Sequence, residues 1–504
     1  MTLLDQHGRV LLAPARRGAV MVPRVRATYD AAQPGGPLQK HWSAADWFSP
    51  NAGANPHVRR QMRSRARYEV ANNPYAAGIV STLANYIVGT GPTLRMVPKD
   101  GIPPKAIKTL QALTDRFNEW AWQVELARTL HVMQRAKSTD GEGLAMLVGR
   151  SSVPDGQVTL GLRTFEAEML TNPQDFMFYV MDKPEGIDLG PDGQPAAYWV
   201  LKHHPGGGMF QVYPTDAQRV PAPLVCHWFD ELRPGLMRGI PEIGPALTMF
   251  AQLRRYTAAV VTAAETAADL AGVLQTDTPP GEEDEIDPGN LFELEKGQLI
   301  TLPQGWKMNQ MKAEHPGTMH ETFIRCMIRE IGRCIDMPYA VAAMDASGHN
   351  YSSMRGDWQA FFAALRWRRA NCERQVLDKI LAAWLQEAVL VYNVALPQEK
   401  FDFVWDWPSS EPIDAVKDAE ADIMRLAANL TTYAKVYAKQ GEDYLSALQQ
   451  RAREEAMLKE LGLQPAQVAP MVPKAGEETP PPAKEEAKAA SPTRRRRVRE
   501  DGDA

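Results

Sequence analysis

Residues 58–91 read VRRQMRSRARYEVANNPYAAGIVSTLANYIVGTG, and this stretch sets the organisation of the fold. It contains two runs of helical periodicity, which are separated by Asn72-Asn73-Pro74. Gly89-Thr90-Gly91-Pro92 ends the second run. Because glycine and proline interrupt helices, the pattern predicts a helical hairpin with a sharp end. A further helical region is predicted over about 103–138.

On either side of these helices the residue composition and the periodicity of the sequence change. Residues 1–57 mix Arg, Pro and Gly without sustained periodicity, which is typical of an extended arm. Between about 143 and 230, short alternating runs lie between turn signals at Pro191-Asp192-Gly193 and Pro205-Gly206-Gly207-Gly208. This pattern predicts a small β barrel or sandwich.

The second half of the chain combines long helices with short strands, so the predicted fold class is α+β. Residues 242–272 read as one Ala-rich helix, about 45 Å long at 1.5 Å per residue. The segment 273–314 follows, with strands expected at 291–294 and 298–302. We then expect a helix over 315–336, a loop over 337–352, a helical pattern over about 353–393, a strand at 401–405, and two or three helices to about 462.

Composition narrows the class of protein. The chain has 504 residues, 56 Lys and Arg against 61 Asp and Glu, a formal charge of −5 and 44% hydrophobic residues, which excludes a disordered acidic chain and a basic nucleic-acid coat. Four cysteines without a C-x-x-C pair argue against a disulfide framework or zinc knuckle and favour a reduced, intracellular protein. No apolar run is long enough for a membrane span or a signal peptide.

The C-terminal segment has a different composition from the rest. Pro, Ala, Lys and Glu dominate from Gln464, which predicts a disordered tail over 463–504. The tail ends in the basic cluster 494–499, and the sequence leaves its role open.

Motifs for chemistry are mostly missing. A phosphate-binding Walker loop needs Gly followed by Lys, and that dipeptide occurs nowhere. His320-Glu321 resembles the start of a metalloprotease helix, but Ile324 stands where the second metal-binding histidine is required. Asp140-Gly141-Glu142 is interpreted as a turn, and Cys326 and Cys334 as packing residues. We therefore predict no enzyme activity, catalytic residue, metal or cofactor.

Four groups of segments form an ordered set of motifs along the chain. The first joins 67–69 and 72–78 with 88–91, and the second is Asp140-Gly141-Glu142. The third joins 186–188 and 192–198 with Arg238-Gly239-Ile240-Pro241, and the fourth joins His315-Pro316-Gly317, Met337-Pro338-Tyr339, Asp345 and Asn350-Tyr351-Ser352-Ser353-Met354-Arg355. Together these motifs resemble the lambda-type family of tailed-phage portal proteins, and the resemblance covers roughly residues 60–395.

The resemblance implies a fold with named parts. These are an N-terminal arm (1–57), a wing (58–241), a stem of two helices (242–272 and 315–336), a small αβ clip between them (273–314), a tunnel loop (337–352), a long helix with a return strand to the wing (353–404), a helical crown (405–462) and the tail.

It also implies a function and partners. Such subunits form a dodecameric ring at one capsid vertex of the virion, after assembly in the host cytoplasm, and double-stranded DNA passes through the ring during packaging and ejection. The expected partners are the terminase large subunit, the major capsid and scaffold proteins, and head-completion or connector proteins. A ring of twelve helices, each about 10 Å across, leaves an opening of roughly 28 Å. Twelve copies at −5 give −60, which favours weak contact with DNA over tight binding.

Two sets of site residues follow. The tunnel-loop residues Asp345, Gly348, His349, Asn350, Tyr351 and Ser352 are expected to face DNA, although Asn-Tyr-Ser-Ser would equally serve as a helix start. The clip residues Glu282, Glu283, Asp284, Glu285, Leu291 and Phe292 are expected to dock the terminase, or else to form a solvated loop with local packing.

Two other classes of protein compete with this prediction. A packaging nuclease-ATPase requires the phosphate-binding loop that the sequence lacks. A non-channel capsid or head-completion protein would share the absence of catalytic motifs, and the oligomeric state distinguishes it from a portal.

Overall fold

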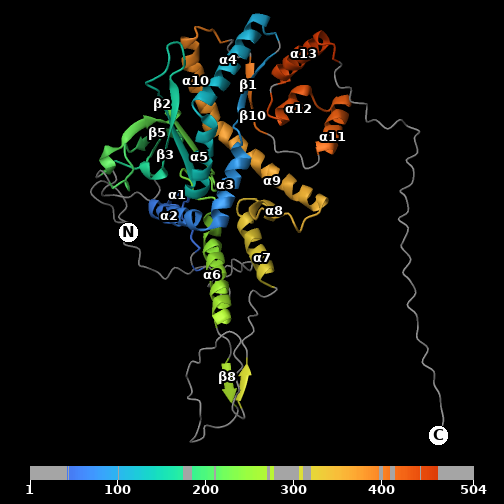
Figure 1. The fold of residues 1–504 in the computed structure, drawn as a ribbon. Coiled ribbons are helices and arrows are strands. Elements are labelled where there is room, and N and C mark those ends of the chain that lie inside the picture. Colours follow the sequence, from blue (N-terminus) through green and yellow to red (C-terminus); the bar gives the residue numbers. More distant parts are fainter. Residues whose placement is uncertain are drawn as a thin grey trace, which may run out of the picture. The chain divides into compact units, whose positions relative to one another are not determined.

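The computed structural model describes residues 43, 45–99, 101–173, 184–208, 212–269, 273–276, 306–309, 319–396, 401–408, 415–442 and 444–463 (Figure 1). The chain divides into two compact units, Met1–Asp443 and Tyr444–Ala504. The first contains helices α1 (Pro50–Gly53), α2 (Pro56–Asn72), α3 (Pro74–Val88), α4 (Pro104–Gln123), α5 (Leu126–Asp140), α6 (Leu247–Asp269), α7 (Met319–Arg333), α8 (Tyr339–Ala342), α9 (Tyr351–Cys372), α10 (Asp378–Val391), α11 (Ala415–Ala427) and α12 (Tyr433–Lys439). The second contains α13 (Tyr444–Glu460).

The predicted helical hairpin is confirmed as α2 and α3. Asn73 ends α2 in an extended conformation, and its side-chain oxygen accepts hydrogen bonds from the backbone amides of Tyr75 and Ala76 at the start of α3. Pro74 occupies the first helical position, where a missing amide hydrogen has no cost. Gly89, at φ 55°, ends α3 in a conformation that glycine adopts readily.

The predicted helical region 103–138 consists of two helices. Glu125, at φ 51°, lies between α4 and α5 and breaks the run. Leu110, Leu113, Phe117 and Trp120 line the buried face of α4. They join a core that also contains α3, α5 and α10, with Phe117 edge-on to Trp384 at 5.2 Å between ring centroids.

Two small sheets form the predicted β region. One has the order β3-β2-β7, from Leu160–Phe165, Glu142–Gly149 and Val225–Phe229, and the other has the order β4-β5-β6, from Ile187–Leu189, Pro195–Val200 and Gln218–Pro221. All strand pairs are antiparallel. Residues of both sheets share one hydrophobic cluster, which is the arrangement of a small sandwich.

The return strand is confirmed as β10 (Phe401–Asp406). It pairs antiparallel with β1 (Thr93–Pro98), and Arg95 on β1 forms an ion pair of 2.7 Å with Asp406. The sequence did not predict β1. The pairing ties the end of the long helical segment back to the region that follows α3 (Figure 1).

The first expected stem helix is shorter than predicted. Pro241, Gly244 and Pro245 hold the chain in a connection that ends in a 3-10 turn, so α6 begins at Leu247 rather than at residue 242. The second, α7, begins within the expected range at Met319. The two helices run antiparallel, because Cys334 after α7 lies against Glu242 while His320 at the start of α7 stacks on Tyr256.

Between these helices the structure describes two short strands. Val273–Thr276 (β8) pairs antiparallel with Trp306–Asn309 (β9). The strands predicted at 291–294 and 298–302 lie outside the described residues.

The long helical pattern from 353 is confirmed, with a change of helix type inside it. α9 passes into a π-helical segment at Glu373–Leu377 and continues as α10. Val376 and Leu377 of this segment are buried in the main core.

Two or three helices are expected after the return strand, and the structure has three there, α11, α12 and α13. In the first unit, Asp422 on α11 forms an ion pair of 2.8 Å with Lys439 on α12. The predicted tail lies outside the described residues, except for residue 463.

The N-terminal arm differs from the expectation at its end. Residues 50–53 form α1, and α2 begins at Pro56 rather than after residue 57. The Asn51 side chain donates to the Gly235 carbonyl and accepts from the Met237 amide, so tertiary contacts order this part.

None of the helices in the described part of the chain has the length and apolar character that a bilayer crossing requires.

Candidate functional site

The predicted tunnel loop joins α7 to α9 and has a defined local structure. Asp345 accepts hydrogen bonds from the Ser347 amide at 2.9 Å and from the Tyr339 hydroxyl at 3.0 Å. The bonds from Ser347, followed by that from Tyr339, lower the pKa of Asp345 to about 2, so this side chain is ionised at neutral pH. Arg325 on α7 lies 4.0 Å from the same carboxylate. The Asp345 carboxylate therefore holds the loop in place through its contacts with Ser347, Tyr339 and Arg325.

The remaining predicted loop residues lie at or near the start of α9. Asn350 is the N-cap residue: its side chain accepts from the Ser353 amide at 2.9 Å, and the Ser353 hydroxyl accepts from the Asn350 amide. The alternative interpretation as a helix start is thus confirmed. Gly348, Asn350 and Ser352 are exposed, and Tyr351 is the first residue of α9.

His349 is half-buried between the loop and the first turns of α9. Its Nε2 atom lies 3.2 Å from a carboxylate oxygen of Asp357. Whether this loop faces DNA stays a prediction. The clip residues Glu282, Glu283, Asp284, Glu285, Leu291 and Phe292 lie outside the described residues.

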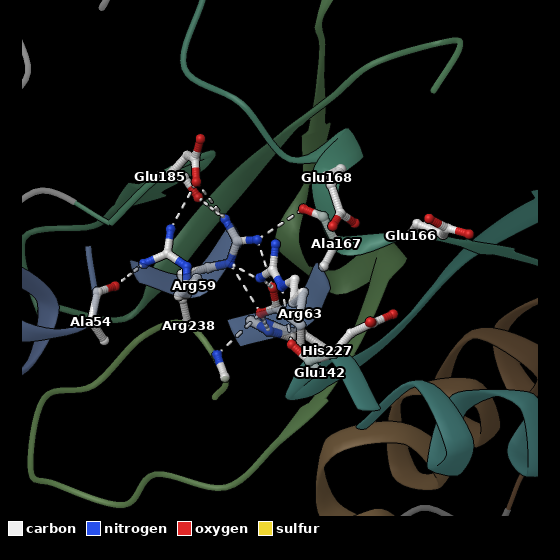
Figure 2. Close-up of polar contacts among 12 residues, drawn as sticks. Ala54, Arg59, Arg63, Glu142, Glu166, Ala167, Glu168, Glu185, His227 and Arg238 are labelled. Atoms are coloured by element: carbon white, nitrogen blue, oxygen red, sulfur yellow. Dashed lines mark hydrogen bonds and ion pairs between the residues drawn. The ribbon is translucent and has the colours of Figure 1, made fainter. Parts of the chain in front are cut away.

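The most developed polar site of the first unit is a buried cluster around Glu142 at the start of β2 (Figure 2). Arg238 donates two hydrogen bonds to the Glu142 carboxylate, from Nη2 at 2.6 Å and from Nε at 3.0 Å. Arg63 on α2 donates from Nη2 at 2.5 Å. Arg59 on α2 pairs with Glu185 at 2.8 Å, which extends the cluster. The cluster therefore joins α2, the small sheets and the segment before α6.

Electrostatics fix the charge state of Glu142. Burial alone would raise its pKa, but the guanidinium groups of Arg238 and Arg63 and the hydrogen bond from His227 outweigh burial and hold the pKa well below its usual range. For His227, burial lowers the pKa despite the nearby carboxylate. A neutral His227 donates from Nε2 to Glu142 at 2.9 Å and accepts at Nδ1 from the Tyr198 hydroxyl at 3.3 Å.

Segments that are far apart in sequence meet at this cluster. Gly141, at φ 94°, ends α5 directly before Glu142, and Gly239 follows Arg238. The two glycine backbones approach so closely that a Cβ atom on Gly239 would collide with the Gly141 carbonyl. Asp140-Gly141-Glu142 and Arg238-Gly239-Ile240-Pro241 therefore form one structural unit. The interpretation of the first motif as a turn was correct but incomplete.

No prediction from the sequence concerns the two buried arginines of α2, Arg59 and Arg63. Arg59, Arg63 and Arg67 recur every four residues along α2, which places them on one face of the helix. Ala66 lies on the same side of the helix and is buried. This spacing indicates that other parts of the protein cover this face of α2. Arginines that contact only water have no reason to share one face of a helix.

A second buried cluster surrounds Glu242, in the connection before α6. Lys137 on α5 contacts its carboxylate at 2.5 Å and also pairs with Asp230 at 2.7 Å. Ser138 donates at 2.6 Å, and Arg368 on α9 donates to the same carboxylate. Burial would raise the pKa of Glu242, but Lys137 and Arg368 lower it well below the usual range. This cluster ties the base of the α6–α7 pair to α5 and α9.

One group in the described ranges has the composition of a metal site. Glu166, Glu168 and His204 bring one possible ligand atom each within 4.8 Å of the others. Arg67 lies between the carboxylates, at 3.2 Å from Glu166 and 2.9 Å from Glu168. A guanidinium already neutralises these carboxylates, so the arrangement favours an ion-pair network over a cation site.

His227 should give the subunit a pH-dependent stability. The unfolded chain binds a proton on this histidine as the pH falls below about 6.5, whereas burial keeps the folded side chain neutral. Its contribution is therefore present above that pH and is lost on acidification. In His227→Gln, we expect the free energy of unfolding to fall less steeply between about pH 6.5 and 5, by up to about 1.4 kcal/mol per pH unit. Urea denaturation at a series of pH values measures this slope.

The matched control is His57→Gln, because His57 is exposed. Its pH slope should equal that of the unmodified chain. Equal slopes for the His227 variant and the control would contradict the assignment of a neutral, buried His227.

Comparison of the sequence with known protein families assigns the chain to a class of structural proteins. The family described as phage portal protein, lambda family, matches residues 41–369. This match covers more than half of the chain, and the chain belongs to that family. The family is structural and non-enzymatic, which confirms the prediction that the chain is not an enzyme.

Individual relatives agree with this assignment. A probable portal protein of Halomonas phage phiHAP-1 is 23% identical over 458 residues, which are 82% of this chain and 84% of the relative. Portal protein B of Escherichia phage lambda is 27% identical over 175 residues, which are 32% of this chain and 33% of the relative.

Among solved structures, the chain matches one described as the neck of a native GTA particle computed with C12 symmetry. It is 16% identical, with a TM-score of 0.44, and covers 81% of this chain and 94% of that chain. An HK97 family phage portal protein from Corynebacterium diphtheriae has 14% identity and a TM-score of 0.22, over 60% of this chain and 82% of that chain. The family assignment rests on the sequence match.

Proposed function

We propose that copies of this chain close into a ring, expected to be dodecameric, whose channel conducts double-stranded DNA into the phage head during packaging and out during ejection. The observation that carries the proposal is the lambda-family portal match over residues 41–369. The antiparallel α6–α7 pair supports it, because paired helices anchored at one end to a folded body can stand side by side around a channel.

The ring would act at a unique capsid vertex of the virion after assembly in the host cytoplasm. In this proposal it contacts the major capsid and scaffold proteins, the head-completion or connector proteins, and the terminase large subunit. The docking surface for the terminase is assigned to Glu282, Glu283, Asp284, Glu285, Leu291 and Phe292, on the basis of the family and of the acidic run alone.

Ring formation is the first test. Electron microscopy and native mass measurement of the purified chain should show one assembly of about twelve copies, with an open lumen of roughly 28 Å at its narrowest helical ring. Monomers under all assembly conditions would contradict the proposal. A closed particle without a lumen would instead support a non-channel capsid or head-completion protein.

The tunnel loop is proposed to meet DNA through weak polar contacts. Gly348 and Asn350 are exposed on a loop that hydrogen bonds hold in place, and Ser352 is exposed in the first turn of α9. The formal charge of the chain, −5, is consistent with a channel wall that does not hold the duplex. Weak contact suits a conduit, since each phosphate neutralised by a basic side chain strengthens binding through counterion release.

Placing a positive charge where this loop enters α9 should therefore slow transit. In Ser352→Lys we expect rings that bind duplex DNA more tightly than unmodified rings, with a salt dependence steeper by about 0.9 in log-log slope for each added phosphate contact. DNA retention by purified rings across a salt series measures this effect. Ser151→Lys is the control, because Ser151 is exposed in the turn between β2 and β3. Identical salt slopes in the two variants would contradict the assignment of the loop to the channel.

A further inference from the structure

The edge of strand β7 is covered by side chains from the long helical segment. β7 is the outer strand of the sheet β3-β2-β7, and no strand among the described residues pairs with its other side. The Phe229 amide donates to Gln375 Oε1 at 2.9 Å, and the Phe229 carbonyl accepts from Asn371 Nδ2 at 3.3 Å. The Val225 carbonyl accepts from Lys379 Nζ at 3.0 Å. Side chains therefore take the place of the backbone groups that a further strand would supply.

The three side chains match the strand edge in length. Asn371, Gln375 and Lys379 have the spacing i, i+4, i+8, which is about 12 Å along a helix at 1.5 Å per residue. Val225 and Phe229 are four residues apart, which is about 13 Å along a strand. The backbone groups on one side of a strand recur every two residues, about 6.7 Å, and this repeat is close to the rise of one helical turn. A helix beside a strand edge can therefore supply one side chain per turn to it.

The π turn at Glu373–Leu377 brings these side chains into one line. In a regular α-helix, positions i and i+8 differ by about 80° of rotation, so Lys379 would point away from the strand that Asn371 contacts. The Asp378 amide donates to the Glu373 carbonyl, five residues back, so this turn holds one residue more than an α-helical turn. The extra residue removes about 100° of rotation and leaves Asn371 and Lys379 within about 20° of each other.

The apolar side of the same segment has the same spacing. Cys372, Val376 and Ile380 are fully buried at positions i, i+4 and i+8. Cys226 on β7 lies with its Sγ atom 3.8 Å from the Val376 carbonyl. Cys326 on α7 is exposed, in contrast to these two cysteines, which corrects its interpretation as a packing residue. The π turn therefore keeps a polar row and an apolar stripe in register with the sheet.

Two other strand edges are covered in a similar way. On α4, Asn118 accepts from the Leu94 amide of β1 at 2.9 Å and donates to the Leu94 carbonyl at 3.1 Å. Thr114, one turn earlier, accepts from the Met96 amide at 3.4 Å. Glu387 on α10 accepts from two backbone amides at the start of β3. Helix side chains in place of a strand are thus a repeated feature of this subunit.

We propose that Asn371, Gln375 and Lys379 form a substitute strand, a row of side chains that the π turn aligns and that closes the edge of β7 against strand addition by another chain. An open strand edge is a template for pairing with a second copy, and natural proteins cover such edges. The same row holds α9 and α10 in one register on the sheet. This inference concerns the single subunit and does not depend on the ring.

Amide hydrogen exchange tests the contact itself. In Gln375→Ala the Phe229 amide loses its acceptor, and we expect it to exchange about fivefold faster, which corresponds to one lost hydrogen bond. Arg374→Ala is the matched control, because Arg374 is the adjacent residue of the π turn and is exposed. Mass spectrometry with single-residue fragmentation of peptides that cover 225–230 measures the exchange. Equal exchange of the Phe229 amide in the two variants would overturn the proposal.

Deletion of one residue tests the role of the π turn. Without Arg374 the turn can become α-helical, and Asn371 and Lys379 stay aligned at seven residues apart, whereas Gln375 turns about 60° away from the row. We expect this variant to fold and to exchange the Phe229 amide as fast as Gln375→Ala. Deletion of Gln386, which is exposed on α10, is the control, because it rotates the following residues by about 100° and should lower the urea midpoint far more. A protected Phe229 amide, or equal losses in the two deletions, would show that the π turn does not align the row.

Aggregation tests the protection of the edge. The double variant with Asn371→Ala and Gln375→Ala should show a several-fold faster rise of thioflavin T fluorescence than the unmodified chain, because its β7 edge is open to a second copy. Leu381→Ala is the control: it removes a buried side chain of α10 and destabilises the subunit but leaves the row intact. Faster aggregation of the control than of the double variant would mean that unfolding, not the open edge, causes it, and the protective role would fail. A chain that forms no ring would contradict the proposed function and leave this inference standing.

Discussion

Glu142→Gln is expected to lower the free energy of unfolding of the subunit by about 3–5 kcal/mol. The carboxylate is fully buried and accepts from Arg238, Arg63 and His227. Removal of its charge leaves two guanidinium groups enclosed without full neutralisation. A hydrogen bond that a neutral amide oxygen accepts from a guanidinium cannot replace that attraction. Urea denaturation of the monomeric subunit measures the loss.

Asp188→Asn is the matched control for this prediction. Asp188 pairs with Arg219 at 3.1 Å, and both side chains are partly exposed, so the control should cost less than about 1 kcal/mol. Adding Arg238→Met to Glu142→Gln should recover part of the loss, since it removes one of the uncompensated charges. A loss as small as that of the control would show that the cluster does not hold α2 against the sheets.

Glu242→Gln is expected to cost a similar amount, about 3–5 kcal/mol, at the base of the α6–α7 pair. Its carboxylate neutralises Lys137, which is fully buried, and Arg368, which is nearly so. Without that charge, α5 and α9 no longer share an anchor with the connection before α6. Proteolysis of this connection, around Pro241–Ala246, should become faster along with the drop in the urea midpoint.

Glu321→Gln supplies the contrast. Glu321 pairs with Arg325 one turn away on the exposed surface of α7, at 2.7 Å, and such a pair contributes about 0.3–0.5 kcal/mol. If Glu242→Gln and Glu321→Gln have equal effects on stability and on cleavage, the Glu242 cluster does not anchor the base of the α6–α7 pair.

Much of the local structure could be predicted because it depends on neighbours in sequence. The α2–α3 hairpin, the helical run from α9 to α10, the return strand β10 and the helices after it follow from periodicity and from capping residues such as Asn73. The predicted start of a helix was wrong where two short-range effects compete. The Ala-rich pattern from 242 suggested helix, but Pro241, Gly244 and Pro245 kept the connection non-helical until Leu247.

The polar sites were predicted less well, since they depend on pairing across the chain. Asp345 and Asn350 were singled out for contact with DNA, and the structure gives them roles in shaping the loop and capping α9. No prediction from the sequence gave Glu142 or Glu242 a role as the centre of a buried cluster. Their partners come from residues about 80 to 130 positions away, and periodicity carries no information at that separation.

The sequence by itself determined the family, the class of structural protein and the order of most helices, because these properties are encoded in local periodicity and in ordered motifs. Only the tertiary structure decided which charges are buried and paired, and that a π turn sets Asn371, Gln375 and Lys379 along the edge of β7. The physical reason is that burial and pairing depend on which distant segments the fold brings into contact, and only the folded chain defines those contacts.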